Sequence, residues 1–372
     1  MTFRNVIYCG PFDTHEGYKG GIYVVANSFC DYYTNLSNKE NLKFIPLNTV
    51  MIRRDKKSFG RLNLQSFKNT LLIKKELKKS LKNTGAKCIY YNSSAGMPLL
   101  KDLLILSKIR DKSVKKIIHI HFAEYDKILP RHFRKTTIRL LKKMDKIVFL
   151  SSNTRDEFIN NGFSKEKTEV LYNFHNIKYS DIDKRNKISR KTEYLNIIFI
   201  GSLDERKGIV DLLNSLKSVS RPFSLNICGT FSNETIKDKC EKLISEIGHD
   251  KIKLCGYVSG EEKEKMLLEA DILVLPSYAE GLPLVVLEGI AAGCTILTTN
   301  VGANPEIIKE ENGMLVCPGD IGNIAYFIQS VSSNQLNEFA KNNFNYGDDF
   351  SIEKFTQKTI SIIEGTIHEK TI

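Results

Sequence analysis

The most constraining feature of the chain is the segment from residue 270 to 306, ADILVLPSYAEGLPLVVLEGIAAGCTILTTNVGANPE. Its apolar run at residues 272–275 ends at a Pro-Ser pair and predicts a strand buried on both faces of a parallel sheet. Pro283 would occupy the first position of a helix, which is predicted by the apolar residues at helical spacing after it. A second buried strand is predicted at residues 295–299. We therefore expect a strand, helix, strand unit with a right-handed crossover.

Two glutamates flank the start of this predicted helix, Glu280 on the loop and Glu288 on the helix. Ligands of open parallel sheets bind at the carboxyl ends of the strands. The N–H groups around Gly281, Leu282 and Leu284 would attract anions, phosphate above all. The helix rises roughly 8 Å over its first five residues, so the two carboxylates could bracket a bound diphosphate. The alternative is that two surface glutamates flank a helix start by chance.

The segment resembles the retaining glycosyltransferases of GT-B fold that form family 4, the glycosyl transferases group 1. Their E-x7-E signature follows a Pro-Ser pair, and here it runs from Glu280 to Glu288. The resemblance implies that Glu280 contacts the transferred sugar and Glu288 the ribose hydroxyls of a nucleotide-sugar. It extends over the flanking EGLPLVVLEGIAAG and over Val301, Gly302, Glu306, Asn312-Gly313 and Pro318-Gly319-Asp320.

The first half of the chain offers a glycine pair and a histidine pair. Gly20 and Gly21 precede an apolar-periodic segment and could cradle a phosphate at a helix N-terminus. The resemblance implies that Gly21 lies near the donor phosphates, and a simple tight turn is the alternative. In IIHIHF, residues 117–122, strand alternation puts His119 and His121 on one face and does not choose between them. The resemblance implies His121, near the donor sugar, and a structural histidine or a metal ligand is the alternative.

Two cations stand beside another predicted helix start, in GSLDERKG. Arg206 and Lys207 suit a diphosphate leaving group, whereas the alternative is a solvated charge pair. The family often has an arginine where this chain has Ser202, so Lys207 matches and Arg206 would substitute in part. The resemblance also implies that Tyr257 and Val258 read the base partly through main-chain groups.

Charge is divided unevenly along the chain. Residues 1–180 carry a net charge of +19 and residues 181–372 a net charge of −7. The basic excess is concentrated in residues 52–82 and 127–146. A basic amphipathic helix is typical of a membrane-surface element, and a solvated helix packed on the sheet is the alternative. The expected apolar stripe of the first basic segment consists of Phe67, Leu71, Leu72, Leu77 and Leu81.

Composition narrows the class of protein and its compartment. Eight cysteines without a C-x2-C pair favour reduced thiols in a cytoplasmic protein and disfavour zinc or a disulfide framework. No signal peptide is apparent and no apolar run reaches roughly 18 residues, so any membrane contact would be peripheral, at the inner face of the cytoplasmic membrane. The pI is near 9.1, but the chain has no Trp and no recognition motif, so nucleic acid is not an expected partner.

The expected fold class is α/β: the GT-B fold, with two doubly wound Rossmann-like domains facing each other across a cleft. The acceptor-side domain would span residues 1–178, with a C-terminal helix at 351–372 packing back on it. Residues 179–195 belong to a polar stretch without an apolar period and would be a linker, and residues 196–350 would bind the donor. In that linker, Asp181 and Asp183 are not expected to hold a metal.

The resemblance implies transfer of a sugar, with retention, from a UDP- or GDP-sugar to an acceptor hydroxyl. The acceptor would be a lipid-linked or growing saccharide of bacterial envelope polysaccharide synthesis, reached at an anionic membrane surface. No metal and no cofactor are expected. The alternatives are a soluble glucan or sucrose-type synthase of the same fold, and a noncatalytic nucleotide-sugar-binding relative.

Overall fold

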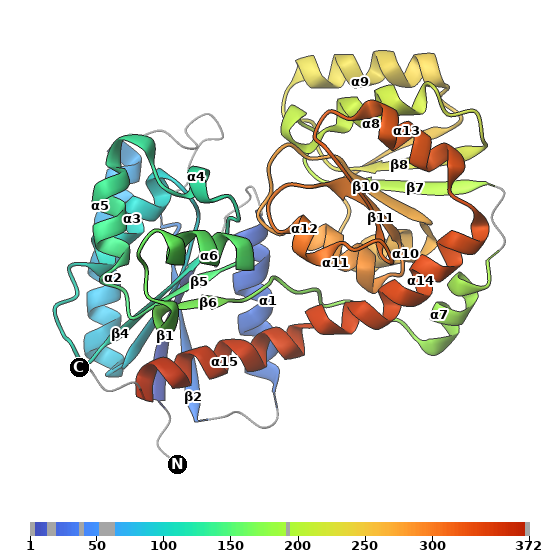
Figure 1. Cartoon of the computed structure of the whole chain (residues 1–372). Helices are drawn as coiled ribbons and strands as arrows, with labels where there is room; N and C mark the ends of the chain where they lie inside the picture. The colour runs from blue at the N-terminus through green and yellow to red at the C-terminus, as the bar shows by residue number, and fades with distance from the viewer. Residues whose placement is uncertain (1–3, 13–19, 37–40, 52–63, 191–193, 369–372) are drawn as a thin grey trace. The chain divides into compact units, whose positions relative to one another are not determined.

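The chain divides into two compact units, each built on a parallel six-stranded sheet with helices between the strands (Figure 1). Unit 1 consists of Met1–Asn173 and Ile352–Ile372, and unit 2 of Phe174–Ser351. The computed structural model describes residues 4–12, 20–36, 41–51, 64–190 and 194–368.

The sheet of unit 1 has the strand order β2-β1-β3-β4-β5-β6. Its strands are β1 (Arg4–Gly10), β2 (Leu42–Asn48), β3 (Cys88–Ser93), β4 (Lys115–Ile120), β5 (Lys146–Phe149) and β6 (Thr168–Val170). The helices are α1 (Gly21–Asn35), α2 (Leu64–Thr84), α3 (Met97–Leu106), α4 (Tyr125–Ile128), η2 (Arg131–Phe133), α5 (Arg134–Leu141), α6 (Ser152–Asn160), η3 (Lys165–Lys167) and α15 (Ile352–His368).

Both faces of the unit 1 sheet are covered, which explains why its strands read as continuous apolar runs. On one face Ile7 and Cys9 pack in a core with the buried sides of α2, α3 and α5. On the other, Tyr8 stacks on Phe29 of α1. Phe29 meets Phe355 of α15 edge-on, with ring centroids 5.9 Å apart. The C-terminal helix therefore completes the core of unit 1.

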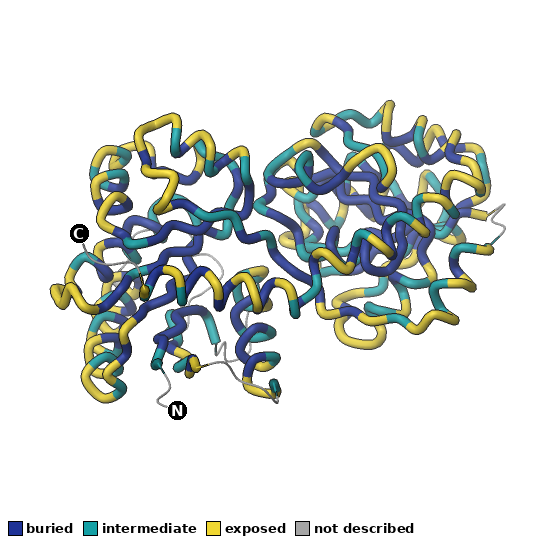
Figure 2. The backbone as a smooth tube through the Cα atoms, turned by 60° about the horizontal axis from the view of Figure 1, so that its bottom comes forward, coloured by how far each residue is buried: buried dark blue, intermediate teal, exposed yellow. Residues whose placement is uncertain are grey.

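The sheet of unit 2 has the strand order β12-β11-β10-β7-β8-β9. Its strands are β7 (Leu195–Ile200), β8 (Phe223–Cys228), β9 (Ile252–Gly256), β10 (Ile272–Leu275), β11 (Thr295–Thr299) and β12 (Gly313–Val316). The helices are α7 (Asp181–Ile188), η4 (Glu205–Lys207), α8 (Ile209–Leu216), α9 (Glu234–Ile247), α10 (Gly260–Glu269), α11 (Leu284–Ala291), α12 (Asn304–Ile307), α13 (Ile321–Ser330), α14 (Ser333–Gly347) and η5 (Asp348–Phe350). Figure 2 shows the buried residues of each unit in dark blue.

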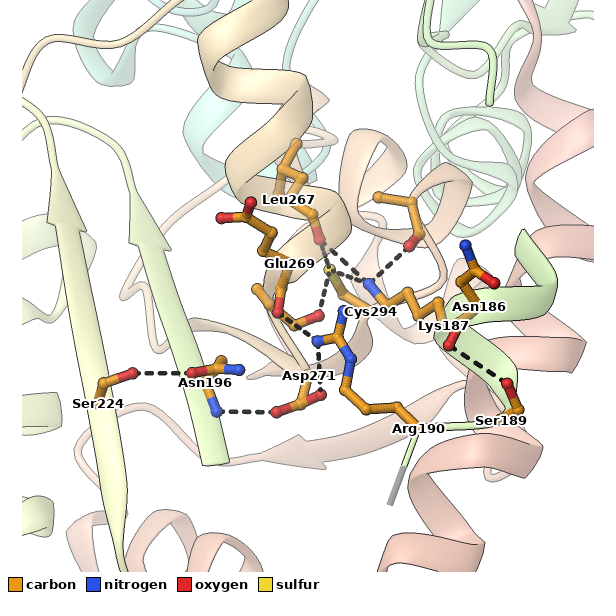
Figure 3. Close-up of polar contacts among 12 residues, drawn as sticks. Asn186, Lys187, Ser189, Arg190, Asn196, Ser224, Leu267, Glu269, Asp271 and Cys294 are labelled. Carbon is orange, nitrogen blue, oxygen red and sulfur yellow. Dashed lines mark hydrogen bonds and ion pairs between the residues drawn. The ribbon is translucent and has the colours of Figure 1, made fainter. Parts of the chain in front are cut away.

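The segment expected to be a linker contains helix α7, which packs on α14 of unit 2. Ser180 and Asp183 form a capping box at its start, so Asp183 caps a helix. The residue that α7 buries is Lys187, whose Nζ donates to the carbonyl oxygens of Leu267 at 3.1 Å and Ala292 at 2.7 Å (Figure 3). The sequence of α7 shows no apolar period because the side chain that it buries is a lysine, which is held by hydrogen bonds.

Two of the expected strands have the predicted bounds, whereas a third strand and a helix start differ. The strands expected at residues 272–275 and 295–299 have the predicted bounds. Strand β4 ends at Ile120, so the expectation that it reaches residue 122 was wrong. Pro283 is the N-cap of α11 instead of its first residue, with a φ of −65° and a ψ of 127°.

The apolar stripe expected on the first basic segment is also wrong in part. Residues 52–63 of that segment lie outside the described residues. On α2, Leu77 faces the core together with Ile73, Ser66 and Asn69. Three other members of the stripe point outward, namely Phe67, Leu71 and Leu72. The helix therefore uses two polar residues in its buried side and leaves apolar ones exposed.

All eight cysteines lie in described ranges and are free thiols. In the described part of the chain, no helix has both the length and the apolar character needed to cross a membrane.

Candidate functional site

Glu280 lies in the loop between β10 and α11 and is 7% exposed. A neighbouring turn holds the loop in place, because the N–H of Ala303 donates to the carbonyl oxygen of Gly281 at 2.8 Å. Gly302 has a φ of +60°, and a Cβ there would come within 2.5 Å of the carbonyl oxygens of Glu280 and Gly281. Only glycine permits this close approach, so the turn after β11 holds the backbone of the loop that carries Glu280.

Two cations reach this carboxylate from the turn after β7. The Nζ of Lys207 lies 2.6 Å from Oε1 of Glu280, and Nη1 of Arg206 lies 3.9 Å from the same oxygen. Arg206 also donates to the carbonyl oxygen of Ala279 at 3.1 Å. Since an ammonium group has three protons and Glu280 accepts one, Lys207 retains donors for an anionic ligand.

The cation turn is shaped by its own short polar residues. Asp204 caps η4 by accepting from the N–H of Lys207 at 2.8 Å, and Ser202 donates to the other oxygen of Asp204 at 2.7 Å. Gly208 ends η4 with a φ of +72°, and a Cβ there would meet the carbonyl oxygen of Pro276 at 2.1 Å. The carboxyl ends of β7 and β10 are thereby packed together, which brings Lys207 to Glu280. Ser202 orients Asp204 through its hydrogen bond.

Helix α11 starts beside Glu280, with Leu284 as its first residue. The first N–H groups of a helix have no acceptor within the helix, and its N-terminus carries a partial positive charge. Glu288 lies one turn further along α11, where its Oε1 is 2.6 Å from Nζ of Lys263 on α10. Leu282 and Gly289 are buried, so the loop and helix are anchored in the core.

Lys263 was not identified from the sequence. Its side chain is 22% exposed and that of Glu288 is 13% exposed, so the pair lies at the margin of the unit 2 core. The two residues are 25 positions apart and belong to different helices. A lysine in the run EEKEK carries no local mark that distinguishes it from its solvated neighbours. Only the packing of α10 on unit 2 shows its partner.

Tyr257 and Val258 directly follow β9 and differ in exposure. The side chain of Val258 is buried, whereas Tyr257 is 66% exposed. Gly256 before them has a φ of +69°, which is a turn conformation that glycine favours. A hollow of about 610 Å³ lies nearby along the same sheet, between the turns after β7 and β8. It is lined by Asp204, Glu205, Arg206, Ser232, Asn233, Thr235 and Ile236.

Two predicted residues lie in unit 1 at the carboxyl ends of its strands. Gly21 is the first residue of α1, after the N-cap Gly20. Gly20 has a φ of −76°, and Gly21 is not among the glycines with positive φ, so the pair does not form a turn that only glycine permits. A Cβ on Gly21 would meet no atom within 4 Å. The alternative of a tight turn therefore has no support in the backbone.

His121 follows the last residue of β4, and its ring lies 4.0 Å from that of His119. The two histidines share one side of the strand, as alternation predicts. Nε2 of His121 is 2.8 Å from Oδ1 of Asn92, and Nδ1 of His119 is 3.0 Å from the hydroxyl of Tyr90. Burial lowers the pKa of His121 to about 3, although Asn173 hydrogen-bonds it and acts in the opposite direction. The imidazole is neutral near pH 7.

Within unit 2 the structure brings Arg206, Lys207 and Glu280 into one cluster, beside the start of α11. Gly21 and His121 occupy the carboxyl edge of the other sheet, in unit 1. Across the described ranges, no group of three or more His, Cys, Asp or Glu side chains could hold a metal ion.

Comparison with known proteins gives a family model that matches part of the chain and a relative that covers most of it. Residues 180–347 match the family model described as Glycosyl transferases group 1. An uncharacterized 41.2 kDa protein in the cps region of Klebsiella pneumoniae is 28% identical over 304 residues, which cover 77% of this chain and 82% of that protein.

Two solved structures have the same fold at low sequence identity. Sucrose-phosphate synthase from Thermosynechococcus elongatus superposes with a TM-score of 0.74 at 16% identity, covering 97% of this chain and 98% of the other. The Anabaena protein HepE, solved with UDP and glucose, superposes with a TM-score of 0.69 at 16% identity. The superposition covers 97% of this chain and 100% of HepE. The two parallel sheets with interleaved helices match those of solved GT-B structures. Residues 180–347 thus match the glycosyl transferases group 1, and the chain as a whole has the GT-B fold.

Proposed function

We propose that this chain is a retaining, metal-independent glycosyltransferase of family 4. It transfers a sugar from a UDP- or GDP-sugar to the hydroxyl of a lipid-linked or growing saccharide. The observation that carries the proposal is the 2.6 Å ion pair between Lys207 and the buried Glu280, next to the N-terminus of α11. A cation pair and a helix N-terminus together favour a bound diphosphate.

In the proposed reaction the bond between the anomeric carbon and the diphosphate oxygen breaks, and the leaving group takes the electron pair. Lys207 and Arg206 stabilise the charge that develops on the diphosphate. The acceptor oxygen bonds to the anomeric carbon on the face from which the diphosphate departs. The proton of the acceptor hydroxyl moves to a phosphate oxygen of the leaving group.

Other residues hold the donor in this proposal. Glu280 orients the transferred sugar, and its bond to Lys207 keeps the sugar contact and the phosphate contact adjacent. Glu288, held by Lys263, accepts hydrogen bonds from the ribose hydroxyls. The neutral His121 contacts the donor sugar, and Gly21 leaves space for phosphate at the start of α1. Tyr257 and Val258 read the base through main-chain groups.

The proposed lipid-linked or growing saccharide acceptor is supported by one relative and by the net charge of unit 1. The Klebsiella relative is described as lying in a cps region, and unit 1 carries a net charge of +18 against −6 for unit 2. Such a basic unit suits an acceptor presented at an anionic membrane surface. A small neutral sugar acceptor would not require this charge.

The proposal is tested by screening UDP- and GDP-sugars for thermal stabilisation of the chain and for slow hydrolysis, then adding acceptors to the donor that binds. We expect one donor to raise the melting temperature, and proton NMR of the product to show the anomeric configuration of that donor. Inversion at the anomeric carbon would overturn the retaining mechanism. Binding of a donor without hydrolysis or transfer to any acceptor would indicate a noncatalytic relative, and turnover on free hexoses or glucans alone would indicate a soluble synthase.

A further inference from the structure

The outer face of one helical layer of unit 1 combines exposed apolar side chains with many basic ones. Helices α2 and α3 contact each other, as do α3 and α5, and all three cover the same face of the sheet (Figure 1). Of the large apolar side chains that the described residues expose, five lie on this layer: Phe67, Leu71, Leu72, Leu104 and Phe133, at 63%, 49%, 40%, 43% and 45% exposure. We call this surface the α2–α5 face.

The basic residues of the α2–α5 face greatly outnumber its acidic ones. Helix α2 contains six lysines and one acidic residue, Glu76. Residues 131–143, which form η2, α5 and the turn after it, contain six basic residues and no Asp or Glu. Most of these cations are exposed, and they include Lys68, Lys75, Lys78, Lys79, Lys82, Arg131, Lys135, Arg139, Lys142 and Lys143.

The apolar residues of α2 lie near the carboxyl edge of the sheet. Asn69 of α2 accepts from the N–H of Met51 at 2.8 Å and donates to the carbonyl oxygen of Thr49 at 3.0 Å, just past the end of β2. The first turns of α2, with Phe67 and Leu71, are therefore at the edge of the sheet that also carries His121. The lysines of the later turns continue along the outer side of the helix.

We propose that the α2–α5 face docks on an anionic lipid surface, with Phe67, Leu71 and Leu72 entering the headgroup region and the surrounding lysines contacting lipid phosphates. Helices that bind membrane interfaces combine Phe or Leu with Lys or Arg in this way. A polyanion such as a nucleic acid would account for the lysines but not for the exposed Phe and Leu. A second copy of the chain would place the same basic residues against each other, which costs electrostatic energy.

Docking on this face brings the carboxyl edge of the unit 1 sheet toward the membrane. A lipid-linked saccharide held in that membrane would then approach unit 1 at this edge of the sheet. This last step rests on the proposed function, whereas the lipid contact itself does not. The two can therefore be tested separately on the full chain.

The test is flotation of the full-length chain with vesicles of neutral lipid alone or of neutral lipid with phosphatidylglycerol. Three variants are compared, each first checked for an unchanged melting temperature. One is Lys75→Glu/Lys78→Glu/Lys79→Glu on α2, one is Phe67→Ser/Leu71→Ser/Leu72→Ser, and the matched control is Lys237→Glu/Lys239→Glu/Lys242→Glu on α9 of unit 2.

We expect the wild type and the α9 variant to float with anionic vesicles at about 0.05 M salt and not with neutral ones. The lysine variant should bind at least about tenfold more weakly, because each basic residue near an anionic surface contributes a severalfold gain. The apolar variant should still bind at low salt but should dissociate at a lower salt concentration than the wild type. Equal binding by all three variants, or vesicle binding by none of the proteins, overturns the inference.

Donor hydrolysis without acceptor is measured on the same samples, because the α2 residues are not part of the donor site. Loss of flotation with unchanged hydrolysis supports the docking surface and leaves the proposed function standing. Flotation of a wild type that hydrolyses no nucleotide-sugar would overturn the function and not the surface. If the chain ignores vesicles and instead forms a dimer that the apolar variant abolishes, the α2–α5 face is an interface between copies and the inference is wrong.

Discussion

Lys207 and Glu280 form one unit at the scale of single residues, although the proposed reaction uses them for different purposes. Their 2.6 Å contact lies between a side chain that is 15% exposed and one that is 7% exposed. Glu288 and Lys263 form a second pair of the same length on α11 and α10. The two carboxylates of E-x7-E therefore each have a lysine partner, and their roles can be separated by kinetics.

The first prediction concerns the two glutamates. Glu280→Ala should mainly lower kcat, because contacts to the transferred sugar change during the reaction. Glu288→Ala should mainly raise KM for the donor, because ribose contacts persist through it. Steady-state kinetics checks this, with the exposed Glu338→Ala as the control. Equal and small effects of both substitutions would contradict the assignment.

Lys207 should stabilise the leaving diphosphate in the transition state. Lys207→Ala is expected to lower kcat/KM by a factor corresponding to about 2 to 4 kcal/mol, as loss of other preorganised charge stabilisers does. Lys239→Ala, at an exposed lysine of α9, is the matched control and should leave kcat/KM unchanged. Kinetics close to wild type for Lys207→Ala would show that the phosphate binds elsewhere.

His121 should make unfolding depend on pH. Its pKa is lowered from 6.5 to about 3 in the folded chain, chiefly by burial, so the unfolded state binds a proton that the folded state does not. The contribution of the neutral ring to stability is complete above pH 6.5 and is lost as the pH falls toward 3. His121→Asn should therefore lose less free energy of unfolding between about pH 7 and pH 5.

Urea titrations followed by circular dichroism measure this difference. Burial and the neighbouring His121 also lower the pKa of His119, which adds to the pH dependence of both proteins. An identical loss of stability on acidification in wild type and variant would mean that His121 accepts a proton in the folded state.

At the scale of elements, α7 shows how a short polar helix can be bound firmly to unit 2. Besides its two carbonyl partners, Nζ of Lys187 lies 3.5 Å from Sγ of Cys294, the residue before β11 (Figure 3). Burial lowers the pKa of Lys187. Arg190, just after α7, donates to the carbonyl oxygen of Glu269 at 2.7 Å and reaches Asp271 at 3.5 Å. These contacts join α7 and Arg190 to the end of α10 and to the residue before β10.

Lys187→Ala should destabilise unit 2 by about 2 to 3 kcal/mol, because it removes the Lys187 donor from the carbonyl oxygen of Ala292, leaves that of Leu267 with only the thiol of Cys294, and creates a cavity. Arg185→Ala, at an exposed position of the same helix, should change stability by at most about 0.5 kcal/mol. Thermal and urea unfolding of the two variants provide the comparison. Equal stability of both would show that α7 is held by its other contacts.

For the whole molecule, the proposed reaction draws its positive charge from side chains and a helix N-terminus. We expect turnover to survive treatment with EDTA, since Lys207, Arg206 and the start of α11 would bear the charge of the leaving diphosphate. Initial rates before and after chelation measure this. Complete loss of activity that manganese restores would show that a metal ion carries the charge instead.

The sequence by itself determined the local parts of this protein. Continuous apolar runs predicted strands such as β10 and β11, because strands buried on both faces show their burial in every residue. The E-x7-E segment placed Glu280 on a loop and Glu288 on a helix, where the structure has them. Alternation put His119 and His121 on one side of β4, and their rings are in contact.

Only the tertiary structure decided which groups meet over long separations. Lys207 and Glu280 are 73 positions apart and Lys187 and Ala292 are 105 apart, and no local pattern encodes such pairs. For this reason the polar residues 179–195 were predicted to be a linker, although Lys187 is buried in unit 2. On α2 the spacing of apolar residues did not reveal that Ser66 and Asn69 face inward and Phe67 outward. The physical reason is that the neighbouring sequence of a charged or apolar side chain can be the same whether the side chain is exposed or buried. Only tertiary packing supplies the partner that makes burial of that side chain favourable.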